Sequence, residues 1–448
     1  MTRDAALTFS RAAAPSGLRL GERLRQLRVA AGLTQSDVAG DRFSKEYVSQ
    51  IERGKTRPTR ETVEWLAARL GVDPGFLANG VATDERGRLE GALSRAEAMI
   101  EALENDEAAV EYETLVPAAR ATGVPELEVR ALVGAGRTQM RLGALKPALD
   151  LLNGARVIVE GASFSDIERA EVFYALGVCR YLLNSNQTAV GLLNEALTLA
   201  ERSGLPSDSL RSNILSWRSR CWRRQRDYEA AREDVERALQ LAEDANDPRT
   251  IGAAYFQASL VADREGHWVL ARNYAERARS AYEELSDRVH VGQLTNNLGG
   301  LNFLLGKTDD AIALLKEAFG IALDTGRNAD AGRAVSSLAQ IHLRTGNVEQ
   351  AEGQARQALQ LLDGQEDYLD EIGNAQLVLG RSLLEQGDLD QAEQAFASAE
   401  ESFSQLGSAS HRAAAWVARG DLAARRGDDR LAAHLYRTAA EALQDVRF

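Results

Sequence analysis

The chain has 448 residues, 44% of them hydrophobic, which is typical of a folded protein but too long for one compact core. We therefore expect several domains or a repeat array that grows lengthwise. The net charge is −13, yet residues 1–72 hold 13 Lys or Arg against 8 Asp or Glu, a local charge of +5 that leaves −18 elsewhere. A small basic region beside a large acidic body suits a protein in which one part contacts an anionic polymer.

Two cysteines in so long a chain argue against a disulfide-bonded extracellular framework. The first 17 residues lack a secretory apolar segment, and no later apolar run approaches the roughly 20 residues that a membrane span requires. We expect a cytoplasmic protein that does not contact membranes, with residues 1–17 disordered. An alternative is that Arg3 and Arg11 form an arm near phosphates.

Residues 18–80 have the pattern of a small domain of five helices. Apolar side chains recur at helical spacing and stop at Gly32, which predicts a first helix that packs them inward and ends in a left-handed cap. These side chains are Leu20, Leu24, Leu27 and Ala31. Thr34 and Asp37 have the spacing of a capping box, and Ser44 and Thr59 are suited to cap the third and fourth helices.

The third predicted helix carries polar side chains opposite its apolar ones. Lys45 and Ser49 form one i, i+4 pair, and Glu46 and Gln50 form another. Lysine donates to guanine, glutamine pairs with adenine and glutamate accepts from cytosine, so this face suits a DNA major groove. The alternative is an ordinary solvated helix face. Further residues expected to contact the DNA are Gln35, Ser44, Arg53, Lys55 and Arg57.

Three motifs give this region a resemblance to the Cro/repressor-type (XRE) helix-turn-helix domain. They are LTQ at 33–35, YVSQIERGKTRPT at 47–59 and LAARLGVD at 66–73. The resemblance implies double-stranded DNA as the partner, with Lys45, Glu46 and Gln50 reading bases and Gln35 contacting the backbone. Glu52 is expected to tie the third helix to a neighbouring arginine rather than to touch DNA.

From about residue 84 the sequence repeats with a period of 40–42 residues. Each unit has a turn residue, alanines five and twelve positions after it, and a small residue seven positions before it. The turn residues are Gly143, Asn184, Arg226, Gly266, Gly306, Gly346, Gly387 and Gly427. Alanines seven residues apart lie on one helix face and let a partner helix approach closely. The pattern resembles the tetratricopeptide repeat and, with a degenerate first unit, predicts an α-solenoid of about nine helical hairpins over residues 81–448.

The resemblance to tetratricopeptide repeats implies that the first helix of each hairpin lines a concave surface. The residues expected there are Arg130, Arg137, Tyr174, Tyr181, Asn213, Arg220, Arg223, Asn296, Phe303, Arg333, Gln340, Asn374 and Arg381. Arginine binds carboxylates bidentately, and asparagine can pair with both backbone groups of an extended peptide. We therefore expect a small peptide or another anionic ligand. The alternative is an ordinary polar groove balanced by carboxylates on neighbouring helices.

No catalytic residues, metal site or cofactor site are expected, because no nucleophile arrangement, metal-ligand spacing or glycine-rich phosphate loop is present in the sequence. The combination of head and repeats resembles the quorum-sensing peptide-receptor regulators. That resemblance implies an all-α homodimer that reads a palindromic operator and whose DNA binding is modulated by a peptide in the repeats. The alternative is a repeat scaffold for a partner protein, with DNA binding secondary.

Overall fold

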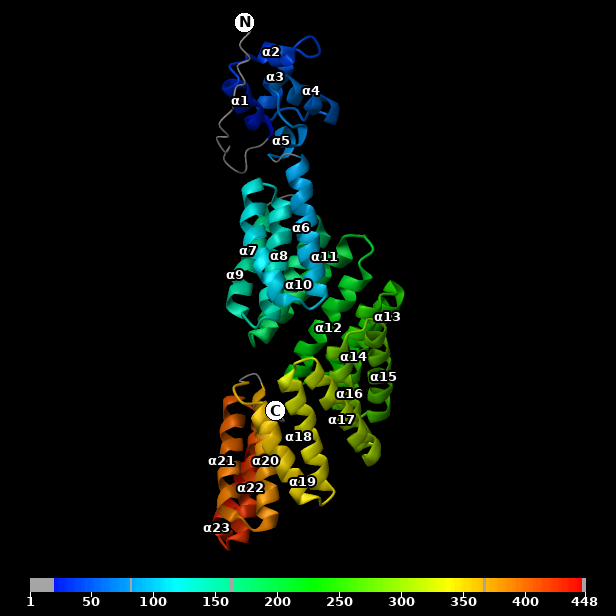
Figure 1. The fold of residues 1–448 in the computed structure, drawn as a ribbon, viewed down its shortest axis with the longest axis vertical. Coiled ribbons are helices and arrows are strands. Elements are labelled where there is room, and N and C mark those ends of the chain that lie inside the picture. The colour runs from blue at the N-terminus through cyan, green and yellow to red at the C-terminus, as the bar shows by residue number, and fades with distance from the viewer. Residues whose placement is uncertain (1–19, 81–82, 162–163, 366–367, 445–448) are drawn as a thin grey trace. The chain divides into compact units, whose positions relative to one another are not determined.

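The computed structural model describes residues 20–80, 83–161, 164–365 and 368–444. The expected disorder of residues 1–17, and the possible arm with Arg3 and Arg11, lie outside these ranges. Within them the regular elements are 23 helices, which confirms the all-α prediction (Figure 1). None of these helices is long and apolar enough to cross a membrane. The chain forms two compact units, residues 1–210 and residues 211–448.

Five short helices form the head, defined here as residues 20–80. They are α1 (Leu20–Ala30), α2 (Gln35–Ala39), α3 (Lys45–Glu52), α4 (Arg60–Leu70) and α5 (Pro74–Asn79). Thr34 and Asp37 form the predicted capping box, and Ser44 and Thr59 each accept a hydrogen bond from a first-turn amide. The prediction that Ala31 packs inward is wrong: it is exposed, because α1 ends one residue earlier.

The other eighteen helices follow one another as nine hairpins, as the repeat predicted. The first unit contains α6 (Thr83–Glu101), α7 (Asn105–Thr122), α8 (Pro125–Arg141), α9 (Leu145–Gly161), α10 (Asp166–Leu182) and α11 (Asn186–Arg202). The helix α12 (Asp208–Gln225) begins at the boundary between the units. The second unit continues with α13 (Tyr228–Ala245), α14 (Pro248–Arg264), α15 (Trp268–Glu284), α16 (Arg288–Leu304), α17 (Thr308–Asp324), α18 (Asn328–Arg344), α19 (Val348–Leu361), α20 (Leu369–Gln386), α21 (Leu389–Gln405), α22 (Ala409–Arg425) and α23 (Asp429–Gln444).

The predicted turn residues all adopt the left-handed backbone, with φ between 59° and 88°. The alanines five positions later are at most 5% exposed and those twelve positions later at most 2%. The former are Ala148, Ala189, Ala231, Ala271, Ala311, Ala351, Ala392 and Ala432, and the latter are Ala155, Ala196, Ala238, Ala278, Ala318, Ala358, Ala399 and Ala439. The degenerate first hairpin follows the same rule, because Leu103 has a φ of 66° and Ala108 is fully buried.

Helices within a hairpin cross where a small residue faces the side chain sixteen positions later. A Cβ added at Gly299 would lie 2.7 Å from Leu315, and one added at Gly380 would lie 2.5 Å from Phe396. Where the small residue is larger than glycine, the residue at the same offset is smaller. The pairs are Ser219 with Val235, Ser259 with Ala275 and Ala339 with Ala355. The eight hairpins after the first thus compensate volume across the crossing, as close packing requires.

Candidate nucleic-acid interface and ligand groove

The polar face of α3 is turned toward solvent. Lys45, Glu46 and Gln50 are exposed, and Ser49 is half-buried. The opposite side of α3 packs into the core of the head. The predicted base-contacting residues therefore share one accessible helix face.

Two of these side chains have partners within the head. Gln50 Oε1 accepts a hydrogen bond from Thr56 Oγ1 at 3.1 Å. Ser49 Oγ accepts one from Arg53 Nη2 at 2.9 Å. Bidentate pairing of Gln50 with adenine needs its oxygen as well as its amide nitrogen, so the Thr56 contact would have to open on DNA binding.

Glu52 anchors α3 to the rest of the head, as the sequence predicted. Arg28 donates to both carboxylate oxygens, at 2.6 and 3.1 Å, and Gln35 Nε2 donates to Oε2 at 2.7 Å. Burial raises the pKa of Glu52, but the hydrogen bonds from Arg28 and Gln35 and the Arg28 charge outweigh burial and lower it. The Gln35 side chain is therefore engaged inside the head, and its contact with the DNA backbone stays a prediction.

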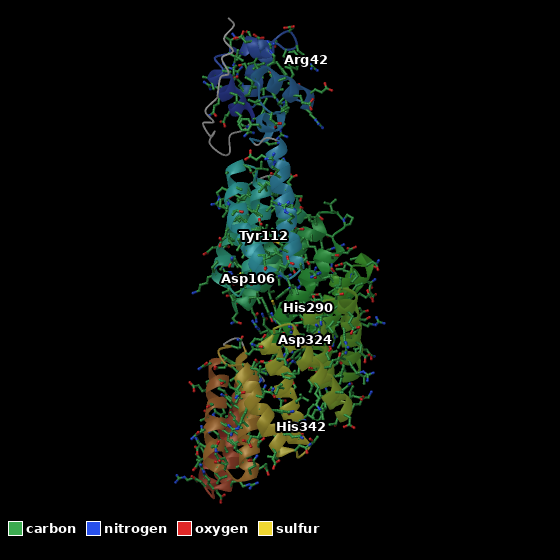
Figure 2. All side chains as sticks on the ribbon, viewed as in Figure 1. Arg42, Asp106, Tyr112, His290, Asp324 and His342 are labelled. Atoms are coloured by element: carbon green, nitrogen blue, oxygen red, sulfur yellow. The ribbon has the colours of Figure 1, made fainter. Side chains whose placement is uncertain are left out.

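A stack of arginines and aromatic rings holds the turn between α2 and α3 against α4. The guanidinium of Arg42, a residue labelled in Figure 2, lies 5.6 Å from the Trp65 ring centre. The Arg69 guanidinium lies 6.0 Å from the same centre. Phe43 meets Trp65 edge-on at 6.5 Å, and Arg69 Nη2 donates to the backbone oxygen of Asp37 at 2.8 Å. Sequence reasoning missed this cluster because its members come from three separate elements.

Exposed cationic residues lie directly after the polar face of α3 in the sequence. Arg53, Lys55 and Arg57 are exposed in and after the turn that ends α3. Gly54 in this turn has a φ of 68°, a conformation that a side chain would disfavour. The sequence-predicted phosphate contacts thus lie close in the chain to the base-contacting residues.

A groove runs along the second unit, with a volume of about 510 Å³. Its walls come mainly from the first helices of successive hairpins, α14, α16 and α18, with Glu371 of α20 at one end. Four predicted ligand-contacting residues line it: Asn296, Phe303, Arg333 and Gln340. The structure therefore brings one part of the predicted set together in a single site.

The predicted residues of the first unit do not share that groove. Arg130 is held by Glu97, whose two oxygens lie 2.6 and 2.5 Å from its Nε and Nη2. Arg137 is exposed, and Tyr174 and Tyr181 are half-buried on α10. Because Arg130 has a bidentate partner, a ligand there would compete with an existing ion pair.

The remaining predicted residues of the second unit are spread along it. Arg220 stacks over the Trp217 ring at 4.1 Å. Arg381 lines a second depression of about 780 Å³, formed by the last three hairpins, which shares Arg344 with the groove. Asn213, Arg223 and Asn374 are half-buried.

Comparison with known proteins assigns both parts. Residues 19–78 match the helix-turn-helix domain family, and residues 290–363 and 377–446 match tetratricopeptide repeat families, none of them an enzyme family. Over 54 residues the chain is 44% identical to the uncharacterized HTH-type transcriptional regulator y4dJ of Sinorhizobium fredii, covering 12% of this chain and 70% of that protein. The chain belongs to the helix-turn-helix transcriptional regulators. It is also 43% identical over 65 residues to the HTH-type transcriptional regulator DdrOP3 of Deinococcus deserti, covering 14% of this chain and only 50% of that relative.

Solved structures share the fold of this helix-turn-helix regulator. A Rap protein complexed with Competence and Sporulation Factor superposes with a TM-score of 0.59 at 17% identity, covering 80% of this chain and 98% of that one. The apo form of the quorum sensor NprR from B. thuringiensis superposes with a TM-score of 0.57 at 14% sequence identity. The match covers 80% of this chain and 99% of that one. These TM-scores show a common fold, and sequence identities this low leave the ligand to be argued from the groove.

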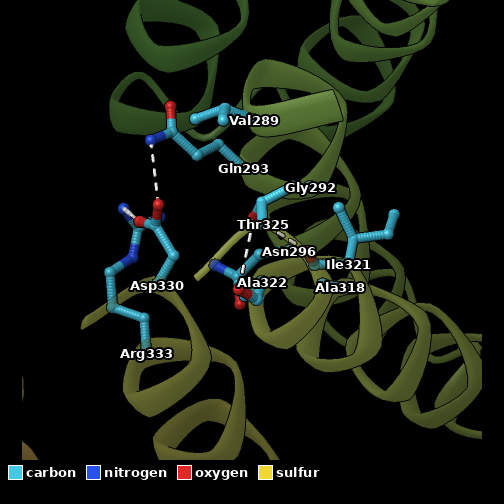
Figure 3. A pocket seen from close by; sticks show the side chains of 10 residues that line it. All are labelled: Val289, Gly292, Gln293, Asn296, Ala318, Ile321, Ala322, Thr325, Asp330 and Arg333. Carbon is cyan, nitrogen blue, oxygen red and sulfur yellow. Dashed lines mark hydrogen bonds and ion pairs between the residues drawn. The ribbon is translucent and has the colours of Figure 1, made fainter. Parts of the chain in front are cut away.

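Charges of both signs line the groove of the regulator. Arg333 Nε lies 3.6 Å from Glu371 Oε1, and Arg333 Nη1 lies 3.8 Å from Asp330 Oδ1. Figure 3 shows Arg333 and Asp330 at a small cleft beside the groove, where Gln293 donates to Asp330 at 3.3 Å. Burial, followed by the hydrogen bond with Asp370, raises the pKa of Glu371 to about 8. The Glu371 carboxyl therefore keeps its proton up to unusually high pH.

Sequence reasoning missed several groove residues. Phe256 and Asp263 of α14 occupy the same positions relative to their turn as Asn296 and Phe303 do in the next hairpin. Extending the repeat register to α14 would have found both. Glu371 lies earlier in its helix than any position inferred from the repeat, so its place in the groove depends on the packing of α18 against α20.

Proposed function

We propose that this chain is a ligand-responsive regulator whose α3 reads a palindromic DNA operator and whose α14–α20 groove binds a small signal, a peptide, that modulates DNA binding. One observation carries the proposal: a helix-turn-helix head with an exposed polar α3 face shares a chain with a groove of about 510 Å³. That volume lies within the range of roughly 300–1,000 Å³ of small-ligand pockets.

In the DNA complex, the roles would divide between bases and phosphates. Lys45, Glu46 and Gln50 would contact base edges, because their side chains project from the exposed face of α3. Contacts to phosphates position a protein without carrying sequence information. The phosphate contacts would come from the exposed cations Arg53, Lys55 and Arg57 and from the helix-start residues Gln35 and Ser44. Ser49 would add a short polar contact.

The amide side chains of the groove support a peptide as the signal. Asn296 Oδ1 is buried and has no hydrogen-bond partner among the described residues, so it is an acceptor available to a backbone N–H. Asn297 and Gln340 line the same groove. A bound ligand would change DNA affinity only through its preference for one arrangement of the array, with couplings of about 1–3 kcal/mol typical.

A homodimer would match a palindromic operator, and the last helix offers a surface for it. Tyr436 and Leu443 of α23 are 38% and 45% exposed. Their equivalents in the preceding hairpin, Phe396 and Phe403, are fully buried, and α22 of the next hairpin contributes to the cluster that covers them. Among the described residues, nothing covers this face of α23. We propose that a second copy of the chain does.

Light scattering at micromolar concentration tests the dimer. We expect a dimer for the native chain and a monomer for Leu443→Glu, because the charge would be buried in the interface. Leu406→Glu is the control, since Leu406 is 40% exposed at the C-cap of α21, in the preceding hairpin. A monomeric native chain would contradict the dimer, and a dimeric Leu443→Glu variant would contradict the interface.

Mass spectrometry of the chain purified from its own cells tests the peptide signal and its main alternative. A short peptide that stays bound, and that is lost after Asn296→Ala, is the expected result. A folded partner protein that co-purifies instead would favour the scaffold function, in which the repeats dock a protein and DNA binding is secondary.

A further inference from the structure

The groove of the second unit is lined by charges of both signs, with Arg264 next to Asp263 on α14 and Glu371 of α20 near the arginines of α18. Asp263 lies on α14 and Arg344 on α18. The helix between them, α16, supplies the amide of Asn296 and the ring of Phe303. A ligand that crosses α16 would therefore meet a carboxylate on one side and a guanidinium on the other.

Asp263 is a groove carboxylate whose cationic neighbours, Arg264 and Arg223, act on it without forming an ion pair among the described residues. It is half-buried, and its side chain makes no ion pair or hydrogen bond with any residue in the described ranges. Burial raises the pKa of Asp263, although the charges of Arg264 and Arg223 lower it in part. Partial burial of an unpaired carboxylate destabilises the folded chain, which makes it a candidate for a binding role.

Arg344 is the guanidinium best placed to take a carboxylate. It is exposed at the groove rim, with its Cζ 5.7 Å from the centre of the Phe303 ring, and forms no ion pair within the described part of the chain. Arg333, by contrast, already lies 3.8 Å from the Asp330 carboxylate and 3.6 Å from the carboxyl group of Glu371. Stacking on Phe303 orients the planar fork of Arg344 and leaves its N–H donors for a ligand.

We propose that the groove takes a dipolar peptide whose cationic group pairs with Asp263 and whose carboxylate pairs with Arg344, while Asn296 accepts an N–H from the segment between them. This inference rests on the proposed function and refines it. It also revises the expectation of an anionic ligand, because the carboxylate of Asp263 lines the groove together with its arginines and asparagines.

The test uses four pools of N-acetylated pentapeptides whose remaining positions are mixtures of uncharged residues. In each pool one position of the peptide is occupied by lysine or by its uncharged isostere norleucine, and this position is scanned along the peptide. The C-terminus is either free or amidated, so the two choices give four pools. Binding to the full chain is followed by thermal shift and titration. We expect the pool with lysine and a free carboxylate to bind about tenfold more tightly than either pool lacking one charge.

Matched variants assign each charge to its residue. Asp263→Asn should abolish the preference for lysine over norleucine, and Arg344→Gln should abolish the preference for the free carboxylate. Asp309→Asn is the control, because Asp309 is exposed at the start of α17, outside the groove lining, and should keep both preferences. At pH 8 and without ligand, Asp263→Asn should also raise the unfolding temperature, whereas a residue with a purely structural role would lower it on substitution.

The outcomes separate this inference from the function on which it rests. If the pools bind without a charge preference, or if the preference for lysine persists in Asp263→Asn, the proposal of a dipolar ligand is contradicted. The proposed function as a peptide-responsive regulator would not be contradicted by these results. Pools that all fail to shift the unfolding temperature would overturn both. A lower unfolding temperature for Asp263→Asn would contradict the unpaired state of its carboxylate.

Discussion

The head and the repeats differ in the interactions that position their proposed binding surfaces, the polar face of α3 and the groove of the second unit. In the head, α3 is fixed to α1 and α2 by one buried charged network, in which Glu52 accepts hydrogen bonds from Arg28 and Gln35. In the repeats, each hairpin is held by a match of volumes, such as Gly380 against Phe396. The orientation of the DNA-reading face thus depends on a few polar contacts in addition to its apolar core, whereas the groove depends on many similar apolar contacts.

The largest expected effect comes from breaking the charged network. Arg28→Ala leaves the Glu52 carboxylate, whose side chain is 4% exposed, with Gln35 as its remaining side-chain donor. We expect the head to lose about 3 kcal/mol of unfolding free energy, because an uncompensated buried charge remains. Hydrogen exchange of α3 amides in the full chain measures the loss.

A matched control uses an exposed ion pair of the same head. Arg60 pairs with Glu64 at 2.9 Å, and their side chains are 93% and 50% exposed. Because exposed ion pairs contribute little to stability, Arg60→Ala should hardly change the hydrogen exchange of the α3 amides. Equal exchange in the Arg28→Ala and Arg60→Ala variants would mean that the network does not hold α3 in place.

The volume match in the repeats can be tested at a crossing. Gly380→Ala would place a Cβ 2.5 Å from the Phe396 ring, and we expect a loss of about 1–3 kcal/mol from overpacking. Gly353→Ala is the control, because a Cβ there meets nothing within 4 Å and alanine favours a helix by about 1 kcal/mol. Thermal unfolding should shift in opposite directions for the two variants, and a shared direction would contradict the crossing.

The same contrast explains what could be predicted from the sequence. Turn residues and alanines recur in every hairpin, so their positions and burial followed from the period alone. The Glu52 anchor followed from the cost of bringing a carboxylate near DNA. The stack of Arg42 on Trp65 and the unpaired state of Asp263 could not be predicted, because each depends on how separate elements pack rather than on spacing within one.

The exposed face of α3 should separate specificity from affinity. Replacing Lys45 and Gln50 by alanine removes base contacts, so discrimination against a mismatched operator should fall by about 1–3 kcal/mol per contact. Lys55→Ala should weaken binding to the operator and to unrelated DNA alike. It should also reduce the slope of the logarithm of DNA affinity against the logarithm of salt concentration by about 1. Fluorescence anisotropy on both DNAs measures each effect, and unchanged specificity in the first variant would contradict the assignment.

The groove should add a dependence of stability on pH. The pKa of Glu371 is about 8 in the folded chain against 4.5 as its ordinary value, so the folded chain holds a proton between these pH values that the unfolded chain releases. Stability should fall as pH rises through this window, by up to about a few kcal/mol. Thermal unfolding from pH 5 to pH 8 should show the slope in the native chain and a flatter profile for Glu371→Gln. Identical profiles would exclude Glu371 as its source.

The central claim is that the groove and the DNA-reading face are coupled. The most direct test is the affinity of the full chain for a selected operator, with and without the peptide recovered from its groove, at one salt concentration. We predict a change of about 5- to 150-fold, the usual range of coupling between two binding sites. Equal affinities in the two states would contradict the account.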